Sequence, residues 1–369
     1  MIGILVENIK LNGGVEIVSK RLLIGFQNVK IPCRGFTFGT GDSDWIGLGD
    51  KYLFSEESIF DVIKTLKEYN IENLIIQLNG PYSKLAFKKF YKLLFKSRIK
   101  VFVVIHNSPK SFITRYFDDN DTIFIQLLKW MRTKFVLNKK YKHFFRGIND
   151  FVSFVSISEG NRKELLDYFG LTSSVIPNFF DFIMMDIPKI VDKKKELLYV
   201  GRIDFYQKNI QLLLDAWKDV KDKKDWILKI IGSGPIDQEN RLRDYIAQEN
   251  ITNIILLGQK DNNSVFEYLN KSSIVMLTSR FEGFPTVILE GAYEGNAFIT
   301  TKFDGISYEL LHDGENCYIC TEENISENIE KLINSPTLLD AFRKKSVDLF
   351  EAYKASNDII KKWIELLNM

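Results

Sequence analysis

The sequence has 369 residues, which is enough for two domains of ordinary size. Its 45% hydrophobic and 27% charged residues indicate a globular protein, and it contains no run of about 18 apolar residues that could span a membrane. The net charge of +2 excludes a strongly basic or strongly acidic class of protein.

The charge is divided unevenly along the chain. Residues 1–183 contain 26 Lys and Arg against 18 Asp and Glu, a net +8, so the remainder carries −6. Within residues 84–148 there are 16 basic and three acidic residues, interleaved with aromatic ones. This composition predicts a basic, aromatic face that attracts an anionic partner.

The first residues, Ile2 to Val6, form an apolar run that Glu7 stops, so we interpret them as a strand and not as a signal peptide. We therefore expect a cytoplasmic protein. The pair Gly13-Gly14 follows, and then a helical pattern from Val15. A Gly-Gly pair allows a ligand or a partner domain to approach the backbone closely, although a plain turn is the commoner explanation of such a pair.

Strand and helix patterns then alternate, which predicts a parallel sheet covered by helices. The expected segments are helix 56–69, strand 74–78, basic helix 84–96, strand 100–105 and strand 151–157. His106 follows strand 100–105 at the carboxyl end of the sheet, where open α/β sheets bind ligands. Because a lone histidine is often structural, a structural role and a binding role both remain open.

The polar segment 186–196 predicts a linker, after which a second alternation begins at Leu197. Arg202 and Lys208 flank a loop that leads from this strand into a helix with Ile210, Leu213, Leu214 and Trp217 at helical spacing. Basic residues at such a loop favour an anionic ligand. Further on, Gly232-Ser233-Gly234-Pro235 predicts a turn where two backbone segments approach closely, because the third glycine of a dinucleotide motif is missing.

Residues 278–295 combine a loop, a helix start and two spaced carboxylates. The apolar run 274–277 predicts a buried strand, Pro285 predicts the first turn of a helix, and Gly295 predicts its end. A strand that leads through a glycine loop into a helix directs backbone N–H groups at an anion. From spacing alone, Glu290 is as compatible with a solvated helix edge as with a ligand site.

The stretch from Glu282 to Glu290 resembles the E-x7-E signature of the family 4 retaining glycosyltransferases, which have the two-domain GT-B fold. The resemblance implies that Glu282 faces the donor sugar and that Glu290 holds the ribose hydroxyls. It also implies that the intervening backbone cradles the diphosphate, here Gly283, Phe284, Pro285 and Thr286. Gly291 departs from the usual alanine, and Asn296-Ala297 replaces the usual turn with proline.

Other segments resemble the same family. Gly201-Arg202 and Lys208 resemble its Gly-Arg-x4-Lys motif with a longer spacer, which assigns Arg202 and Lys208 to the diphosphate. Gln259 and Lys260 correspond to backbone that faces the nucleotide base. Gly13-Gly14-Val15-Glu16 resembles a loop of the family that closes over the donor phosphate or the acceptor. His106 resembles a histidine that contacts the transferred sugar. Ile176-Pro177-Asn178 resembles the family's domain boundary.

We therefore expect two facing Rossmann-like α/β domains of the GT-B type, with the active site in the interdomain cleft. Residues 1–183 would bind the acceptor, residues 184–350 would bind the donor, and residues 351–369 would form a terminal helix, with Trp363, that crosses back to the first domain. The implied enzyme moves a hexosyl or N-acetylhexosaminyl group, with retention, from a nucleotide diphosphate sugar to a saccharide, and we expect the nucleotide to be UDP. The donor is a substrate, so no cofactor is expected.

Other functions stay open. A nucleotide-sugar epimerase of the same architecture would need acid and base residues around one sugar carbon, and the chain has only three histidines. A non-catalytic partner subunit would be expected to lose the donor residues, which this chain retains. The pairs Asp42/Asp44 and Asp119/Asp121 could suggest a metal-dependent transferase, but both lie in polar loop-like sequence, so we expect no metal site.

The basic region 84–148 adds a hypothesis about location. Residues 84–100 and 126–148 each contain seven Lys and Arg and no acidic residue, and Phe87, Tyr91, Leu94 and Phe95 recur at helical spacing. Nothing resembles a nucleic-acid-binding motif, so no nucleic acid is expected. We expect a peripheral enzyme on the inner face of the cell membrane, with a lipid-linked acceptor in lipopolysaccharide or capsule biosynthesis.

Overall fold

The computed structural model describes residues 1–10, 14–49, 55–78, 87–112, 138–180, 192–303 and 309–368, together with residues 124, 125, 128 and 131. The described residues form two compact units. Unit 1 holds those up to residue 180 and those from Asn357 onward, and unit 2 holds residues 192–356. None of the helices in the described part of the chain combines the length and apolarity that a membrane span requires.

Unit 1 is built on a sheet of seven strands in the order β3-β2-β1-β4-β5-β6-β7. Every neighbouring pair is parallel, and the register places Ile4 beside Gly35 on one side and Ile75 on the other. The strands are β1 (Ile2–Val6), β2 (Cys33–Thr37), β3 (Trp45–Gly47), β4 (Asn73–Leu78), β5 (Lys100–Ile105), β6 (Ser153–Ser156) and β7 (Ser174–Val175).

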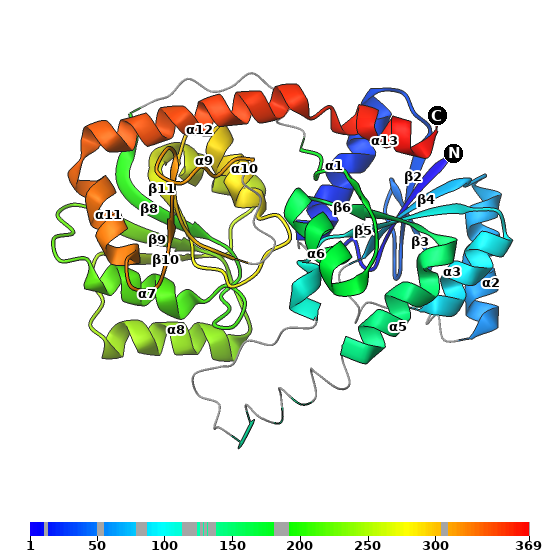
Figure 1. Cartoon of the computed structure of the whole chain (residues 1–369), viewed down its shortest axis with the longest axis horizontal. Helices are drawn as coiled ribbons and strands as arrows, with labels where there is room; N and C mark the ends of the chain where they lie inside the picture. Colours follow the sequence, from blue (N-terminus) through cyan, green and yellow to red (C-terminus); the bar gives the residue numbers. More distant parts are fainter. Residues whose placement is uncertain are drawn as a thin grey trace. The chain divides into compact units, whose positions relative to one another are not determined.

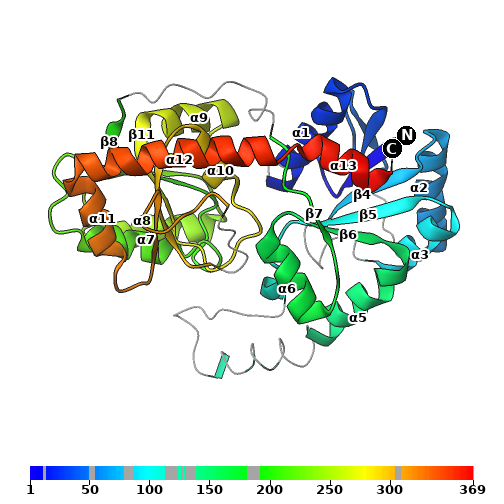
Figure 2. The ribbon, with the colours of Figure 1, turned by 45° about the horizontal axis from the view of Figure 1, so that its top comes forward.

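Helices cover both faces of this sheet, which is why β1 and β4 are buried along their whole length. Figures 1 and 2 place α2, α3 and α5 along one side, and α1 and α13 along the other. The helices are α1 (Gly14–Asn28), α2 (Glu56–Glu68), α3 (Lys88–Lys96), α5 (Asn138–Ile148), α6 (Glu159–Phe169) and α13 (Ile359–Leu367), with short 3-10 turns at Pro109–Phe112 and Asn149–Phe151.

The last helix, α13, packs against α1 within unit 1. Gly25 of α1 makes this possible, because a Cβ there would lie 2.8 Å from the Ile360 side chain and 2.9 Å from Phe179. Trp363 is 2% exposed in the same layer. The chain returns to unit 1 at Asn357, directly after α12 ends.

Unit 2 contains a sheet of six parallel strands in the order β10-β9-β8-β11-β12-β13. Its strands are β8 (Lys194–Val200), β9 (Ile227–Ile231), β10 (Ile254–Gly258), β11 (Ser272–Leu277), β12 (Ala297–Thr301) and β13 (Cys317–Cys320). Its helices are α7 (Ile210–Asp219), α8 (Ile236–Gln248), α9 (Asn262–Lys271), α10 (Thr286–Tyr293), α11 (Ile325–Asn334) and α12 (Pro336–Ser356). Figure 1 shows α9 and α10 on one side of this sheet and α7 and α8 on the other.

Much of the sequence-based prediction is confirmed. The strand and helix alternation holds in both units, and the periodic residues Ile210, Leu213, Leu214 and Trp217 of α7 are all fully buried. Trp217 also donates its indole N–H to the Thr252 carbonyl at 3.1 Å, so its polar atom is satisfied inside the core.

The predicted linker 186–196 extended too far toward the carboxyl terminus. Strand β8 begins at Lys194, three residues before the expected start. A charged residue can lie in this strand because Glu196, which is buried, pairs with Lys229 of β9 at 2.7 Å and accepts a hydrogen bond from Ser272 at 3.2 Å. A buried ion pair of this kind is invisible to a hydrophobicity pattern.

The close approach predicted at Gly232 is confirmed. Gly232 follows β9 with φ +148°, and a Cβ there would lie 1.8 Å from the carbonyl oxygen of Gly201, which follows β8. Gly258 is the last residue of β10, with φ +68° and open space around the position of a Cβ. The first glycine is required by sterics and by conformation, the second by conformation alone.

We predict that Gly232→Ala lowers the free energy of unfolding by roughly 3 kcal/mol or more, because the new methyl group meets backbone that cannot rotate away. The matched variant Gly258→Ala should cost about 1–2 kcal/mol, the penalty for a left-handed alanine. Urea denaturation followed by circular dichroism measures both. Equal losses for the two variants would contradict the close approach.

Candidate functional site

The candidate site lies where the strand order of unit 2 reverses. β8 and β11 are neighbours at the centre of the sheet, and the chain continues to β9 on one side and to β12 on the other. In open α/β sheets the loops at such a reversal diverge and leave a ligand crevice at the carboxyl ends of the strands. The loop after β8 carries Arg202 and Lys208, and the loop after β11 carries Glu282.

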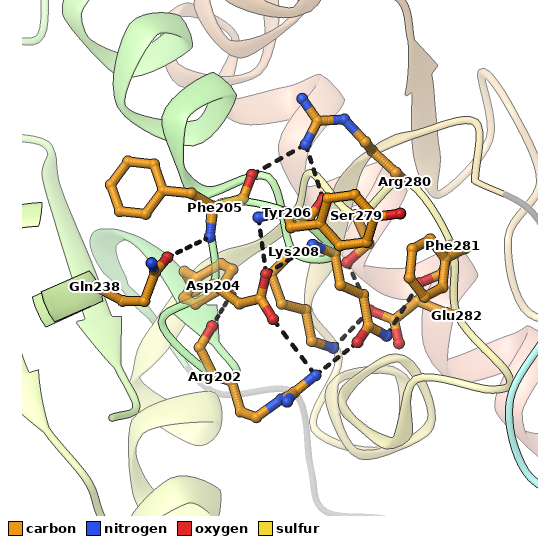
Figure 3. Close-up of polar contacts among 12 residues, drawn as sticks. Arg202, Asp204, Phe205, Tyr206, Lys208, Gln238, Ser279, Arg280, Phe281 and Glu282 are labelled. Carbon is orange, nitrogen blue, oxygen red and sulfur yellow. Dashed lines mark hydrogen bonds and ion pairs between the residues drawn. The ribbon is translucent and has the colours of Figure 1, made fainter. Parts of the chain in front are cut away.

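A salt bridge joins these two loops. Lys208 Nζ lies 2.5 Å from Glu282 Oε1, and the two side chains are 18% and 8% exposed. Ser279 donates its hydroxyl to the same Oε1 at 2.6 Å, and Thr278 donates its hydroxyl to the Lys208 carbonyl at 3.0 Å. Figure 3 shows the Lys208 and Glu282 side chains turned toward each other. Sequence analysis predicted both residues, and the structure brings them into contact.

The loop after β8 is held by Asp204. Its Oδ1 accepts hydrogen bonds from the backbone N–H groups of Tyr206 at 2.8 Å and Gln207 at 2.7 Å. Its Oδ2 lies 3.6 Å from the Arg202 guanidinium, which also donates to Gln207 Oε1 at 2.6 Å. Arg202 keeps 65% of its side chain exposed. The guanidinium is therefore oriented by its neighbours and still accessible to a ligand.

Arg280 fastens the second loop to the first. Its guanidinium donates to the carbonyl oxygens of Phe205 at 3.0 Å and Tyr206 at 2.8 Å, and its backbone N–H donates to the Gln207 carbonyl at 2.9 Å (Figure 3). Sequence analysis missed this residue. Its partners are main-chain atoms about 75 positions away, so no motif marks them.

Helix α10 begins directly after the second loop. Pro285 occupies its N-cap position and makes no side-chain cap hydrogen bond. The first backbone N–H groups of the helix therefore have no capping side chain, which is the usual state of an anion-binding helix start. The predicted diphosphate cradle, Gly283 to Thr286, forms this start, and Glu290 lies half-buried within α10. Gly295 ends the segment at φ +68°, as predicted.

Gln259 and Lys260 lie after β10, the edge strand of the sheet, and both are exposed. Ser233, after β9, donates its hydroxyl to Gln259 Oε1 at 3.2 Å. These residues thus share the carboxyl edge of the sheet with the salt bridge, but two strands, β9 and β8, separate β10 from β11. The contacts of the described residues do not join them to Lys208 or Glu282.

His106 lies in unit 1, directly after β5, and is 7% exposed. Its Nε2 lies 2.5 Å from Gln77 Oε1 of β4, and because a carbonyl oxygen can only accept, Nε2 carries the proton. Burial lowers the pKa of His106 from 6.5 to about 4. The ring is therefore neutral at physiological pH, with Nδ1 available to accept a hydrogen bond.

The Gly13-Gly14 pair and the two Asp-x-Asp pairs complete the set of residues that the sequence singled out. Gly14 is the first residue of α1, with open space around the position of a Cβ, and Gly13 lies outside the described residues. Asp42 Oδ1 accepts hydrogen bonds from the backbone N–H groups of Asp44 and Trp45, both at 3.0 Å, and so stabilises a turn. The pair Asp119/Asp121 lies outside the described residues. Among the residues that are described, no three His, Cys, Asp or Glu side chains gather closely enough to hold a metal ion.

Comparison with known proteins gives a family match over part of the chain and a fold. Residues 182–348 match the sequence model of the family Glycosyl transferases group 1, and this span contains Arg202, Lys208, Glu282 and Glu290. Anabaena HepE, crystallised in complex with UDP, superposes with a TM-score of 0.73 at 15% identity, over 100% of this chain and 99% of HepE. The predicted fold class, two Rossmann-like α/β domains of the GT-B type, is confirmed.

Two relatives of known name match parts of the chain. The amylovoran biosynthesis glycosyltransferase AmsD of Erwinia amylovora is 31% identical over 48% of this chain and 49% of AmsD. The N-acetylgalactosamine-N,N'-diacetylbacillosaminyl-diphospho-undecaprenol 4-alpha-N-acetylgalactosaminyltransferase of Campylobacter jejuni is 26% identical over 55% of this chain and 58% of that enzyme. The chain spans about half the length of the curated relatives that it matches.

The neutral state of His106 predicts a pH dependence of stability. The unfolded chain takes up a proton at this histidine below pH 6.5, whereas the folded protein takes it up only near pH 4. The unfolded state thus binds more protons in this window, and the free energy of unfolding falls as the pH is lowered through it, by up to about 3 kcal/mol.

His106→Gln should remove this contribution and flatten the dependence of the free energy of unfolding on pH between 6.5 and 4. Urea denaturation of both proteins across this range measures the slope. A variant that loses stability with falling pH as steeply as the wild type would contradict the buried neutral histidine.

Proposed function

We propose that the protein is a glycosyltransferase that moves a hexosyl or N-acetylhexosaminyl group from a nucleotide diphosphate sugar to a saccharide acceptor. The observation that carries this proposal is the salt bridge between Lys208 and Glu282. It puts a cation suited to a diphosphate and a carboxylate suited to a sugar within 2.5 Å of each other at the strand-order reversal. The family match over residues 182–348 supports the same conclusion.

Lys208 and Arg202 would hold the donor diphosphate. Negative charge on the leaving nucleoside diphosphate grows as the glycosidic bond breaks, and cations that are already oriented stabilise that charge without rearrangement. Arg202 is oriented by Asp204 and Gln207 and remains accessible. The start of α10 would add backbone N–H groups, and Glu290 would accept hydrogen bonds from the ribose hydroxyls.

Glu282 would face the donor sugar. In the free protein its charge is balanced by Lys208, and a bound diphosphate would compete for that lysine. The carboxylate would then lie opposite a sugar carbon that becomes positive in an oxocarbenium-like transition state. Asp204, the other carboxylate of these loops, is committed to two backbone N–H groups and does not serve as a nucleophile. We therefore favour front-face transfer with retention of configuration.

The donor and acceptor follow from chemistry and relatives. HepE, which has the same fold, was crystallised with UDP, and we propose UDP as the nucleotide, with the backbone of Gln259 and Lys260 at its base. The Campylobacter relative is named for an acceptor that contains diphospho-undecaprenol, and AmsD for amylovoran biosynthesis. We propose a lipid-linked saccharide acceptor in lipopolysaccharide or capsule biosynthesis, on the cytoplasmic side of the membrane. His106 Nδ1 would accept a hydrogen bond from a sugar hydroxyl.

Lys208→Ala should lower turnover by roughly 100-fold or more at saturating donor, as the loss of an electrostatic stabiliser does. Release of UDP from UDP-sugars measures it. Lys229→Ala is the matched control, since Lys229 also forms a buried pair with a glutamate in unit 2, at 2.7 Å, but lies within a strand. Turnover that survives in Lys208→Ala, or falls equally in both folded variants, would remove Lys208 from the reaction.

We also propose that protein cations replace a divalent metal ion in stabilising the leaving group. Transfer should therefore continue unchanged in excess EDTA. The same UDP-release assay, with and without chelator, checks it. Activity that EDTA abolishes and manganese restores would overturn this proposal and bring back Asp42, Asp44 and the second Asp-x-Asp pair as metal ligands.

A further inference from the structure

A basic pocket lies between α3 and α5 on unit 1. Its volume is about 480 Å³. The residues that line it are Lys88, Lys139, Lys142, His143, Arg146 and Gly147. Among the described residues, every side chain that lines this basic pocket is thus a cation or an imidazole, and none is a carboxylate. It is separate from the residues of the proposed donor site, which belong to unit 2.

The cations of the basic pocket lack compensating charges. Within the described part of the chain, no carboxylate forms an ion pair with Lys88, Lys139, Lys142 or Arg146. The neighbouring Lys89, by contrast, pairs with Glu56. Like charges that converge without counter-charges repel one another, and this arrangement costs free energy unless an anion enters.

Two local features bring the charges together at further cost. Lys88 stands in the first turn of α3, which contains no acidic residue, so its charge opposes the positive end of the helix dipole. Gly147 of α5 lets the Lys88 side chain lie across the helix, since a Cβ there would be 2.8 Å from Lys88 Nζ. Both features lower stability in the absence of a ligand, and both favour a bound anion.

The aromatic residues of this region serve a different purpose from the one predicted. Tyr91 and Leu94 of α3 are fully buried, and Phe87 packs against the core of unit 1. Of the four residues expected on an aromatic face, only Phe95 is exposed, at 55%. On α3 the predicted aromatic face was wrong, because the helical spacing of these residues marks the core side of the helix, whereas Trp130 and Phe135 lie outside the described residues. The exposed side of α3 therefore carries mainly lysines, Lys88, Lys89, Lys92 and Lys96, together with Phe95.

Apolar side chains are nevertheless exposed just before α5 in the sequence. Phe124, Ile125, Leu128 and Met131 are 68%, 41%, 45% and 38% exposed and have the spacing of one helical face. Exposed apolar residues at helical spacing within a strongly basic stretch of sequence are typical of proteins that lie on membranes. This pattern favours a lipid surface over a soluble anion as the source of the phosphate.

We propose that the basic pocket binds the phosphate of an anionic lipid head group and docks unit 1 on a membrane. The phosphate would take the place of the missing carboxylates between Lys88, Lys142 and Arg146. Docking of this kind needs neither donor nor transfer, so it stands independently of the proposed function.

The test is co-sedimentation of the full chain with vesicles. The wild type should bind vesicles of equimolar phosphatidylcholine and phosphatidylglycerol, and bind weakly to phosphatidylcholine alone. Reversing the pocket charges by Lys88→Glu, Lys142→Glu and Arg146→Glu should lower the partition coefficient roughly 100-fold or more, since each engaged cation contributes to binding at an anionic surface. Lys64→Glu, Lys67→Glu and Lys163→Glu change the net charge equally at exposed positions of unit 1 and should retain most binding.

Other outcomes would overturn the proposal. Equal loss in the two triple variants would show that net charge, not the basic pocket, controls binding. Equal binding to both kinds of vesicle, or binding to neither, would exclude an anionic lipid as the ligand of the basic pocket. If the protein binds inorganic diphosphate at the basic pocket but does not bind vesicles, the ligand of the pocket is a soluble anion and not a lipid. Thermal stabilisation by UDP, measured on the same variants, reports separately on the donor site and on folding.

Discussion

The salt bridge between Lys208 and Glu282 is the interaction on which the candidate site depends. Its two charges are nearly buried, so each must keep a partner of opposite charge. A ligand that replaces Glu282 as the partner of Lys208 must therefore carry a negative charge. The part of that ligand that contacts Glu282 must be stabilised by a carboxylate or at least be compatible with one. A nucleotide diphosphate sugar satisfies both conditions in one molecule, with its diphosphate on one side and its electrophilic carbon on the other.

The same unit contains a second buried pair, which shows that chemistry alone does not make a site. Lys229 and Glu196 are 2.7 Å apart and 15% and 7% exposed, close to the values for the first pair. They lie on neighbouring strands, and Lys229 is covered by the Tyr268 ring at 5.4 Å. Lys208 and Glu282 instead lie on loops at the strand-order reversal. Position in the fold, not burial or charge, separates the pair that we propose as functional from the structural one.

The sequence predicted those features that depend on the local spacing of residue types. Alternating strands and helices, the spaced Glu282 and Glu290, and the steric need for Gly232 could all be predicted. The Arg280 contacts could not, because they join a side chain to carbonyl oxygens of a distant loop. The aromatic spacing of α3 was misinterpreted for a related reason. Periodicity identifies one face of a helix but does not say whether core or solvent lies against it.

The central claim is that Glu282 holds Lys208 in the free protein and that a diphosphate replaces it. Titration of UDP by isothermal calorimetry tests this most directly, with Glu282→Gln and the matched Glu196→Gln. Loss of the Glu282 charge leaves Lys208 without its counter-charge, so UDP should bind about tenfold tighter than to the wild type, whereas Glu196→Gln should leave the affinity unchanged. Weaker or unchanged binding of UDP to Glu282→Gln would contradict the account.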